Sequence, residues 1–585
     1  MNTPCTYILP SPWCPLKRGR LRTPEEDPPP REAAATKTGV TTALAQAAGI
    51  VATLTVVSKV FGFLRESALA HGFGATTATD AYLVAQTVPT ALFAAGAAVG
   101  IAFIPVFAGI LEKEGRQVAY RTASTVMNAT IWLAAVVIVV GELLAAPLVR
   151  LVAPGFEGDA LVLTALLTRC MFPMILFQAL NGLFTGMLQT ERDFAAPALV
   201  ALLFNGVIIA SILALGPIYG IPAVACGTTA AAAAQALAQY AVLRRRGFRW
   251  TPTLDWKDPH LRRLGILLVP IVAGSVAGQM GAVVEKMLAS GLPEGSISAL
   301  NYGTRLVQFP NGVIGTSIVT VLYPTLASLA SGGDRERFRL ALSQGVRVVC
   351  FFMVPLAVGL ALLREPIVAL AFQRGRFDAA ATEASAFALL FLSIGLVGFT
   401  LRELLSRAYY SLQDTRTPMF VGLAGLGLNI GLNLVLTPLL RQGGLALGAA
   451  LSALLTTTGL LYLLRRRLGH IDGKAIVSSL VKILVASGAM AAAAQGTHGL
   501  VQTLWPGSGL GAQALRLGAV AGVGAVVYGI AAALLRLPEL RTVAELGGRM
   551  GKRFGRGGRV ARSAEVTLRG SQVEAGGEGP ERAGR

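Results

Sequence analysis

Charged residues stand inside otherwise apolar segments of this sequence, where they could bind an anion. The run SKVFGFLRE (58–66) holds Lys59, Arg65 and Glu66. An ionisable side chain in an apolar span costs about 2.5–3.5 kcal/mol, so those that persist are candidates for function. Lys59 and Arg65 lie on different faces of a straight helix, and a bend near Gly62 would turn both toward one cavity. The alternative is a local pair between Arg65 and Glu66 at the membrane interface.

Arg305 is a sharper candidate, because no acidic residue lies within four positions of it. We expect it to need an anionic partner. A guanidinium can hold a phosphate through two parallel hydrogen bonds, so Arg305 is predicted to bind a phosphate or diphosphate in a cavity of low polarity. Asp80 opens an apolar segment beside Thr79. It is predicted to be either a first-turn acid or a countercharge for Arg65.

Two pairs of polar residues stand in later apolar segments. Glu285 and Lys286 are neighbours, and a simple pair at the interface is as good an interpretation as a binding site. Asn429 and Asn433 are four positions apart, so their amides share one face of a helix. Those amides could offer oxygens to a small hard cation, or they could form hydrogen bonds between helices.

The remaining charged, histidine and cysteine residues do not indicate an enzyme. Arg402, Glu403 and Arg407 are interpreted as an ion-pair cluster at the interface rather than as a binding site. The four histidines are scattered and the five cysteines form no CxxC pair, so we predict neither a metal centre nor a disulfide. A membrane-embedded glycosyltransferase would need carboxylates or metal ligands clustered at one membrane face, and the sequence offers no such cluster.

The segments that carry these residues have the composition of a membrane protein. Of 585 residues 54% are hydrophobic and only 14% are charged, and the mean hydropathy is +0.61. A net charge of +20 could indicate nucleic acid, but the positive residues lie between apolar segments and in the tails. We therefore predict an all-α, polytopic membrane protein that binds no nucleic acid.

Apolar stretches long enough to cross a ~30 Å hydrocarbon core recur along the chain. The predicted helices are 44–64, 80–110, 122–146, 159–188, 194–215, 221–243, 264–289, 296–329, 338–363, 380–411, 417–438, 444–464, 475–495 and 512–535. An even number places both termini on one side. Loops 244–263 and 465–474 carry seven and four Lys or Arg, whereas 216–221 and 496–513 carry none, so that side is predicted to be cytoplasmic.

An internal repeat relates two parts of the sequence at an offset of about 219–224 residues. Matched landmarks are Pro89 with Pro310, Pro105 with Pro324, Pro147 with Pro366, and Gln189 with Gln413. Residues 41–246 (the first half) and 247–467 (the second half) would each hold six helices. Halves with an even number of helices insert in the same orientation, related by a pseudo-two-fold axis along the membrane normal, and enclose a central cavity.

Three segments lie outside the repeat. Residues 468–540 are predicted to form two extra helices and a groove facing the lipid. Residues 1–40 contain no apolar core of a signal peptide and are predicted to be a disordered basic extension. Residues 541–585 are rich in Gly and Arg and are predicted to be a disordered basic tail.

The sequence resembles the MurJ/MviN family of the multidrug/oligosaccharidyl-lipid/polysaccharide flippase superfamily. The resemblance covers roughly 44–535 and is carried by SKVFGFLRE (58–66), ATDAYLVAQTVP (78–89), LPEGSISALNYGTRLVQFPNGVIG (292–315) and QDTRTP (413–418). Each of these stretches is weak evidence alone, and together they are specific. The family implies two six-helix lobes around a cationic cavity, with a groove for a polyprenyl tail beside the last two helices.

The resemblance implies a transporter rather than an enzyme. Its expected activity is to move lipid II, the undecaprenyl-pyrophosphate-linked peptidoglycan precursor, from the inner to the outer leaflet of the bacterial cytoplasmic membrane by alternating access. We expect a monomer that contacts lipid II and membrane lipids. An exporter of another polyprenyl-linked oligosaccharide, or a drug or cation antiporter of the same superfamily, is the alternative. Arg305 and the fourteen helices argue against a drug antiporter.

The resemblance also implies site residues. It places substrate contacts at Lys59, Arg65, Asp80 and Arg305, and a sodium site at Glu285, Asn429 and Asn433. Lys59 stands where arginine is usual, and Asn433 replaces a more usual acid, which weakens the expectation of sodium coupling. Residues 80–110 lack Lys and Arg, so the cavity is expected to be less positive than in some relatives. Apart from sodium as a coupling ion, no cofactor is expected.

Overall fold

The computed structural model describes residues 31–252, 255–469, 471–504 and 509–540. The chain forms two compact units, Met1–Thr53 and Leu54–Arg585, and the contacts described below belong to the second. We expected disorder through residue 40, whereas α1 already begins at Arg31. The run REAAATKTGV that opens α1 contains no proline and is rich in alanine, which favours a helix. The tail 541–585 lies outside the described residues.

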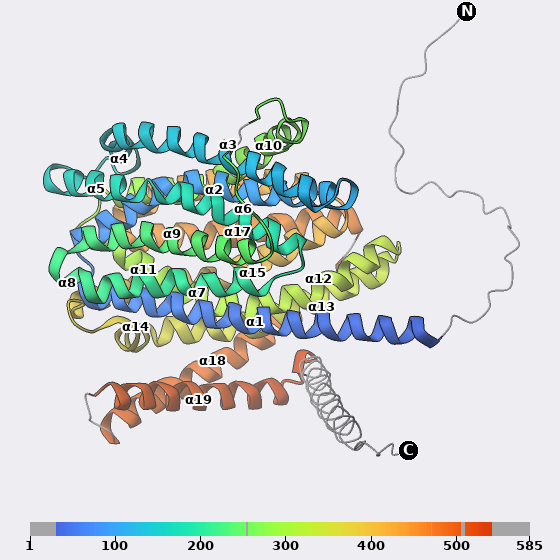
Figure 1. Cartoon of the computed structure of the whole chain (residues 1–585). Helices are drawn as coiled ribbons and strands as arrows, with labels where there is room; N and C mark the ends of the chain where they lie inside the picture. Colours follow the sequence, from blue (N-terminus) through green and yellow to red (C-terminus); the bar gives the residue numbers. More distant parts are fainter. Residues whose placement is uncertain (1–30, 253–254, 470, 505–508, 541–585) are drawn as a thin grey trace, which may run out of the picture. The chain divides into compact units, whose positions relative to one another are not determined.

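All regular structure in the described part of the chain is helical, as predicted (Figure 1). The first half contains α1 (Arg31–Phe73), α2 (Thr77–Lys113), α3 (Arg116–Leu143), α4 (Ala145–Val152), α5 (Gly158–Met171), α6 (Met174–Thr190), α7 (Ala195–Ala210), η1 (Ser211–Leu215), α8 (Gly216–Tyr219) and α9 (Ile221–Arg245). The remainder contains α10 (Pro259–Ala289), α11 (Ser296–Pro310), η2 (Asn311–Gly315), α12 (Thr316–Ser331), α13 (Arg335–Leu362), α14 (Arg364–Phe372), α15 (Ala379–Ser411), α16 (Arg416–Leu440), α17 (Gln442–Leu468), α18 (Gly473–Leu504) and α19 (Leu510–Leu534).

Long apolar helices occur at the positions predicted to span the membrane. Eleven helical segments of the described residues are long and apolar enough to cross a membrane. The three other predicted spans, 44–64, 80–110 and 264–289, fall within the long helices α1, α2 and α10. Some segments are less regular than expected. The helix expected at 159–188 divides at Phe172 and Pro173, where the proline lacks a backbone N–H donor. The helix expected at 296–329 contains the π-helical turn η2.

The backbone itself repeats between the two halves. Residues with positive φ recur 221 or 222 positions apart: Gly74 and Gly295 (67° and 80°), Arg192 and Gln413 (63° and 58°), Gly220 and Arg441 (69° and 50°), and Gly247 and Gly469 (97° and 92°). Positive φ is uncommon outside glycine, so the match between Arg192 and Gln413 is strong evidence for a repeat. These pairs support the internal repeat that the proline and glutamine positions indicated.

Equivalent loops of the two halves are closed by the same contacts, which we call the Asp–Arg clasps. Asp193 accepts hydrogen bonds of 3.1 Å from two backbone N–H groups in the first turn of α7, and it pairs with Arg246 after α9. Asp414 accepts a bond of 3.0 Å from the backbone N–H of Thr417, and it pairs with Arg467 in α17. Each aspartate thus caps one helix and ties it to the helix that ends its half.

Loops of the two halves contact each other at one end of the helices, which we call the closed end. The contacts are Thr77 N–H to Glu294 Oε1 (2.7 Å), Gly155 N–H to Ser290 Oγ (3.1 Å) and Arg376 N–H to the His71 carbonyl (3.0 Å). A Cβ at Gly155 would overlap the carbonyl of Ser290, so this approach requires glycine. The Asp–Arg clasps lie at the opposite end of the same helices.

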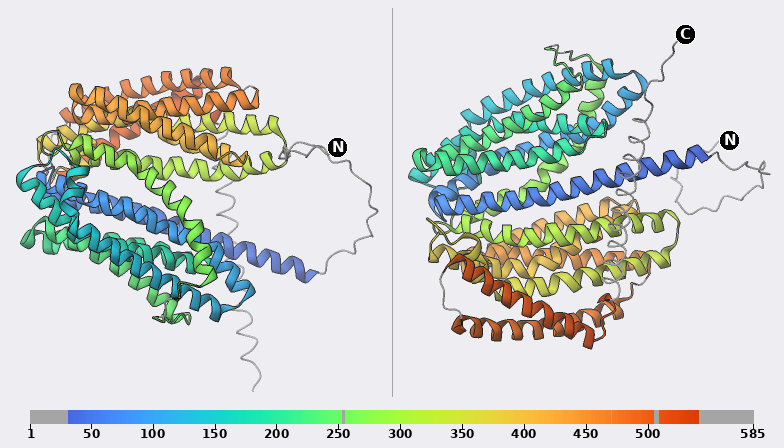
Figure 2. Two further views of the ribbon diagram at one scale, coloured as in Figure 1. Left: turned by 90° about the horizontal axis from the view of Figure 1, so that it is seen from above. Right: turned by 60° about the horizontal axis from the view of Figure 1, so that its bottom comes forward.

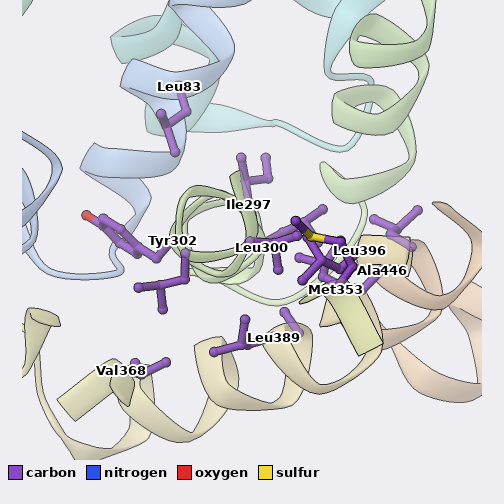
Figure 3. Close-up of a cluster of buried hydrophobic side chains, with 14 of the residues drawn as sticks. Leu83, Ile297, Leu300, Tyr302, Met353, Val368, Leu389, Leu396 and Ala446 are labelled. Atoms are coloured by element: carbon purple, nitrogen blue, oxygen red, sulfur yellow. The ribbon is translucent and has the colours of Figure 1, made fainter. Parts of the chain in front are cut away.

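Apolar packing fixes the position of α11. Tyr302 is fully buried, with its ring centroid 4.8 Å from that of Phe372 and 5.3 Å from that of Phe377. Figure 3 shows Ile297 and Tyr302 around this helix, with Leu83 of α2 on one side and Leu389 of α15 on the other. Because interiors of this kind are close-packed, polar residues on α11 are held in defined positions.

The two unrepeated helices α18 and α19 pack against each other and, through α18, on α13 (Figure 2). The Tyr528 hydroxyl donates to the Phe351 carbonyl at 2.7 Å. Beyond α19, the buried carboxylate of Glu539 lies 3.4 Å from Arg347 and accepts a bond of 2.9 Å from Ser479. Polar contacts therefore fasten this pair to the second half.

Candidate functional site

Arg305 lies on α11 and faces a carboxylate from a distant part of the sequence. Its Nε atom is 3.2 Å from Oε1 of Glu66 on α1. Glu66 is buried, with 3% of its surface exposed. The sequence predicted that Arg305 needs an anionic partner, and the protein itself provides one. Spacing along the chain did not reveal this partner, because the contact forms only when the two halves meet.

Glu66 also binds a second cation. Nη2 of Arg65 is 2.6 Å from the same Oε1 atom, and Asn301 donates to Oε2 at 3.2 Å. The expected local pair between Arg65 and Glu66 therefore forms, but Arg305 shares it. We call these three residues the Arg–Glu–Arg cluster. Two guanidiniums share one carboxylate, so the cluster keeps one uncompensated positive charge.

The two arginines of the cluster face different spaces. Arg65, Glu66 and Tyr82 line a hole of about 10 Å³, close to the size that a single water molecule needs. Arg305 instead faces a cavity of about 150 Å³ between α2 of the first half and α10 and α11 of the second. Arg305 is thus the member of the cluster with room for a ligand.

The cavity beside Arg305 contains a second cation and many hydrogen-bonding groups. Lys286 lines it, and its ammonium nitrogen is 3.5 Å from Glu285 Oε1, the pair predicted as one alternative. The neutral polar residues of the lining are Gln86, Thr87, Thr90, Gln279 and Asn301. Charge-assisted hydrogen bonds from two cations, supplemented by amides and hydroxyls, suit a ligand with several anionic oxygens.

Asp80 lies away from the arginines. Its carboxylate accepts hydrogen bonds from the backbone N–H groups of Gly295 at 2.8 Å and Ser298 at 2.7 Å, and from the Ser298 hydroxyl. The structure therefore does not bring Asp80 to Arg65 as a countercharge. The free N–H groups at the start of a helix attract a carboxylate, and Asp80 satisfies those of α11 from the other half of the chain.

Lys59 is also separate from the cluster. Its ammonium nitrogen lies against the backbone of η2, where a Cβ added to Gly312 would stand 2.6 Å from it. α1 continues as a helix through Gly62, so the predicted bend that would bring Lys59 and Arg65 together does not interrupt it. Residues six apart on such a helix point in different directions, which explains their different surroundings.

Asn429 and Asn433, two residues of the sodium site that the resemblance implied, contact each other on α16. Nδ2 of Asn433 donates to Oδ1 of Asn429 at 3.2 Å. Asn433 is 2% exposed, and its Oδ1 atom has no hydrogen-bond partner among the described residues. A buried oxygen that lacks a donor fits a hard cation. Within the described residues, no hydrogen bond or ion pair joins Glu285 to either asparagine.

Arg402, Glu403 and Arg407 do not form the ion-pair cluster expected from sequence. In the part of the chain that the structure describes, none of them pairs with an oppositely charged side chain. All three line a cavity of about 910 Å³ within the second half. The space around them lets each charge be hydrated separately, so the small gain of a surface ion pair does not fix them together.

Comparison with known proteins supports the family that these residues suggested. The family model described as lipid II flippase MurJ matches residues 69–510. The chain belongs to the MurJ lipid II flippase family. A lipid II flippase MurJ of Burkholderia cenocepacia is 31% identical over 424 residues, which cover 70% of this chain and 82% of the relative. The expected membership of the MurJ/MviN family is confirmed.

Solved structures support the fold. A lipid II flippase MurJ in an inward closed conformation matches with a TM-score of 0.69 and 21% identity, over 83% of this chain and 98% of its own. An inward-facing multidrug resistance transporter of the MATE family, in the same superfamily, matches with a TM-score of 0.63 and 12% identity, over 72% and 98%. Members with different cargoes therefore share this fold, and the cargo has to be argued from the site.

Proposed function

We propose that this chain moves lipid II from the inner to the outer leaflet of the bacterial cytoplasmic membrane by alternating access. Membership of the MurJ family supports the cargo. The observation that carries the proposal is Arg305, which faces a cavity between the halves and belongs to a cluster with one uncompensated positive charge. A pyrophosphate supplies the missing negative charge, and Arg305 and Lys286 donate hydrogen bonds to it.

In this mechanism Glu66 holds the site ready while it is empty. The carboxylate keeps Arg305 in place through a contact of 3.2 Å, which limits the cost of a bare guanidinium in an apolar environment. The arriving pyrophosphate adds negative charge on the cavity side of Arg305. Binding then favours the conformation in which the halves approach each other around the head group, and rocking of the halves exposes it to the other side.

The sidedness follows from the loops. The basic loops lie at the end that carries the Asp–Arg clasps, so we assign that end and both termini to the cytoplasm. The closed end then faces outward. Substrate enters from the cytoplasmic leaflet while the closed end is shut, and release requires the contacts of Thr77, Gly155 and Arg376 to break. One chain holds both halves of this cavity, so we propose that the monomer transports.

Sodium is proposed as a coupling ion at the asparagine pair. Asn429 and Asn433 would contribute amide oxygens, and Glu285 would contribute a carboxylate from α10. The buried, unpartnered Oδ1 atom of Asn433 supports this assignment. Sodium, but not potassium, should raise the thermal unfolding temperature of the wild-type protein and not of Asn433→Leu. If sodium and potassium change the unfolding temperature of both proteins equally, the proposed sodium site at Asn433 is wrong.

The cargo is tested by complementation in a walled bacterium whose own lipid II flippase is depleted. The wild-type chain should restore growth and outer-leaflet lipid II, and Arg305→Ala should restore neither. Arg465→Ala, which removes an exposed arginine at the end of α17, is the control for loss of a positive charge. Normal flipping by Arg305→Ala would end the proposed role of this residue. Restored drug efflux without restored growth would favour the other cargo class.

A further inference from the structure

The cavity of about 910 Å³ in the second half is a separate space from the one beside Arg305. It lies among α10, α11, α15, α16 and α17. A continuous face of α15 lines it, through Phe399, Arg402, Glu403, Ser406, Arg407 and Tyr410. These positions recur every three or four residues, which is the spacing of one helix face. The face therefore presents guanidinium, hydroxyl and phenol donors to a single volume.

The charged residues that line this cavity are two arginines and two glutamates, Glu285 and Glu403. Arg402 and Arg407 form no ion pair among the described residues, and the guanidinium of Arg407 lies 5.5 Å from the ring centroid of Tyr323, a contact that leaves its charge in place. Glu285 at the margin already lies beside Lys286 at 3.5 Å. Glu403 forms no ion pair with either arginine among the described residues, so both guanidiniums face the cavity without a paired acid.

The two cavities are neighbours across α11. Gln308 lines the larger cavity, while its Oε1 atom accepts a hydrogen bond of 3.4 Å from Arg305, which lines the smaller one. Thr304, next to Arg305 in sequence, also faces the larger cavity. A ligand with two separated anionic groups could therefore place one on each side of this helix.

We propose that the cavity lined by Arg402 and Arg407 is a second anion-binding site, which takes a carboxylate or phosphate group distinct from the one held at Arg305. Two guanidiniums without acid partners, facing a volume large enough for a sugar or peptide fragment, carry this assignment. The identity of the ligand rests on the proposed function: the bound group is a carboxylate on the peptide of the lipid-linked substrate. The head group of an acidic phospholipid shares the chemistry and is the other source.

The site itself is tested without the substrate. Citrate, a soluble carboxylate, is titrated against the full-length protein in nanodiscs of neutral lipid, and the thermal unfolding temperature is measured. Citrate should stabilise the wild-type protein and Arg465→Ala equally. The double variant Arg402→Ala/Arg407→Ala should bind it about 10- to 100-fold more weakly, because two charge-assisted hydrogen-bonding groups are lost. Equal stabilisation of the double variant would overturn the proposal.

Glu403→Gln provides a variant that should act in the opposite direction. It removes the carboxylate that competes for the two guanidiniums, so citrate affinity should rise about two- to tenfold. A gain of affinity cannot be explained by misfolding, which keeps the test meaningful if the double variant is unstable. Weaker citrate binding by Glu403→Gln would contradict the proposed competition and the site with it.

The source of the anion is tested with lipids. Lipid II carries peptide carboxylates, whereas undecaprenyl pyrophosphate lacks them. Loss of Arg402 and Arg407 should weaken binding of lipid II about tenfold or more and leave undecaprenyl pyrophosphate unchanged. A loss seen only when phosphatidylglycerol is in the nanodisc would assign the same anion site to phospholipid. If the wild type binds citrate but not lipid II, the proposed cargo fails while the anion site stands.

Discussion

At the residue scale, Glu66 is the group on which the cationic site depends. It lies between Arg65 and Arg305, and both cations use the same oxygen atom. Removing one partner of a buried ion network leaves the other charges without compensation, which is costly even where the intact network adds little stability. Glu66 therefore determines how much free positive charge the empty site holds.

Glu66→Gln should lower the free energy of unfolding by about 3–5 kcal/mol, because two guanidiniums lose their counterion. Inorganic pyrophosphate should recover part of the loss by supplying negative charge to Arg305. The measurement is thermal unfolding of the purified protein with and without pyrophosphate. Glu112→Gln, at an exposed position near the end of α2, is the matched control. Unchanged stability of Glu66→Gln would contradict the shared-carboxylate arrangement.

Glu294 should make the closed end sensitive to acid. The Thr77 backbone N–H donates to its carboxylate and holds the pKa of Glu294 below its usual value. A lowered pKa in the folded state stabilises the protein fully above the unfolded pKa of about 4.3, and this contribution disappears as pH falls through the folded value. The difference in unfolding temperature between wild type and Glu294→Gln should therefore shrink as pH falls below about 4. A difference that stays constant with pH would exclude this contact.

The residue types of the site could be predicted from sequence, but their partners could not. Arg305 was identified because an unpaired arginine in an apolar segment is costly. Its partner Glu66 lies in the other half of the chain, and so do the backbone N–H groups of α11 that donate to Asp80. Such contacts depend on how the halves pack, and no local spacing encodes them. For the same reason Arg402 and Arg407 were interpreted as interfacial.

At the element scale, the helices were predictable because an apolar run of about 20 residues admits few other structures in a bilayer. The breaks within them were harder to predict. Pro173 marks one break and Pro310 directly precedes η2, but prolines within α2 and α13 cause no such break. Such breaks depend on neighbouring helices, so the sequence of the segment alone does not reveal them.

The repeated loops contain a removable strain. Gln413 adopts a φ of 58° just before the clasp residue Asp414. Left-handed backbone costs a residue with a Cβ roughly 1–2 kcal/mol, while glycine adopts it freely. Gln413→Gly should therefore raise stability by about 0.5–1 kcal/mol after the larger entropy of the unfolded glycine chain is included. Thermal or urea unfolding measures the change.

The control variant is Ser411→Gly, which introduces glycine two residues before Gln413. Ser411 is the last residue of α15, where the backbone is helical and glycine brings no relief of strain. Its replacement should leave stability unchanged or lower it by up to about 0.5 kcal/mol. If both variants lower stability alike, the positive φ of Gln413 stores no strain.

At the scale of the whole molecule, the closed end separates the two sides of the transport path. Thr77→Cys and Glu294→Cys, introduced together into a variant without other cysteines, should be joined by a short thiol-reactive cross-linker. The bridge should stop flipping by holding this end shut, and a reducible linker should allow recovery after reduction. Flipping is assayed by access of an external probe to lipid II. Each single cysteine variant should remain active after the same treatment.

Continued transport by the cross-linked protein would show that the closed end need not open.

Sequence could predict the two halves and their common orientation, because these follow from the repeat and the even number of helices. It could not predict which end is shut. The two conformations of such a transporter use the same residues and differ by only a few kcal/mol, so no residue pattern distinguishes them.

The bond between Asp80 and α11 has a consequence for how the protein is made. Asp80 is synthesised 218 residues before Ser298, whose backbone N–H donates to it. During that interval the backbone donors of α11 are not yet available to the carboxylate. The Asp193 clasp lies wholly within the first half, so that half can be secured early. When α11 has been made, its backbone N–H groups can donate to Asp80 and so join the two halves. This contact is therefore a late step of biogenesis.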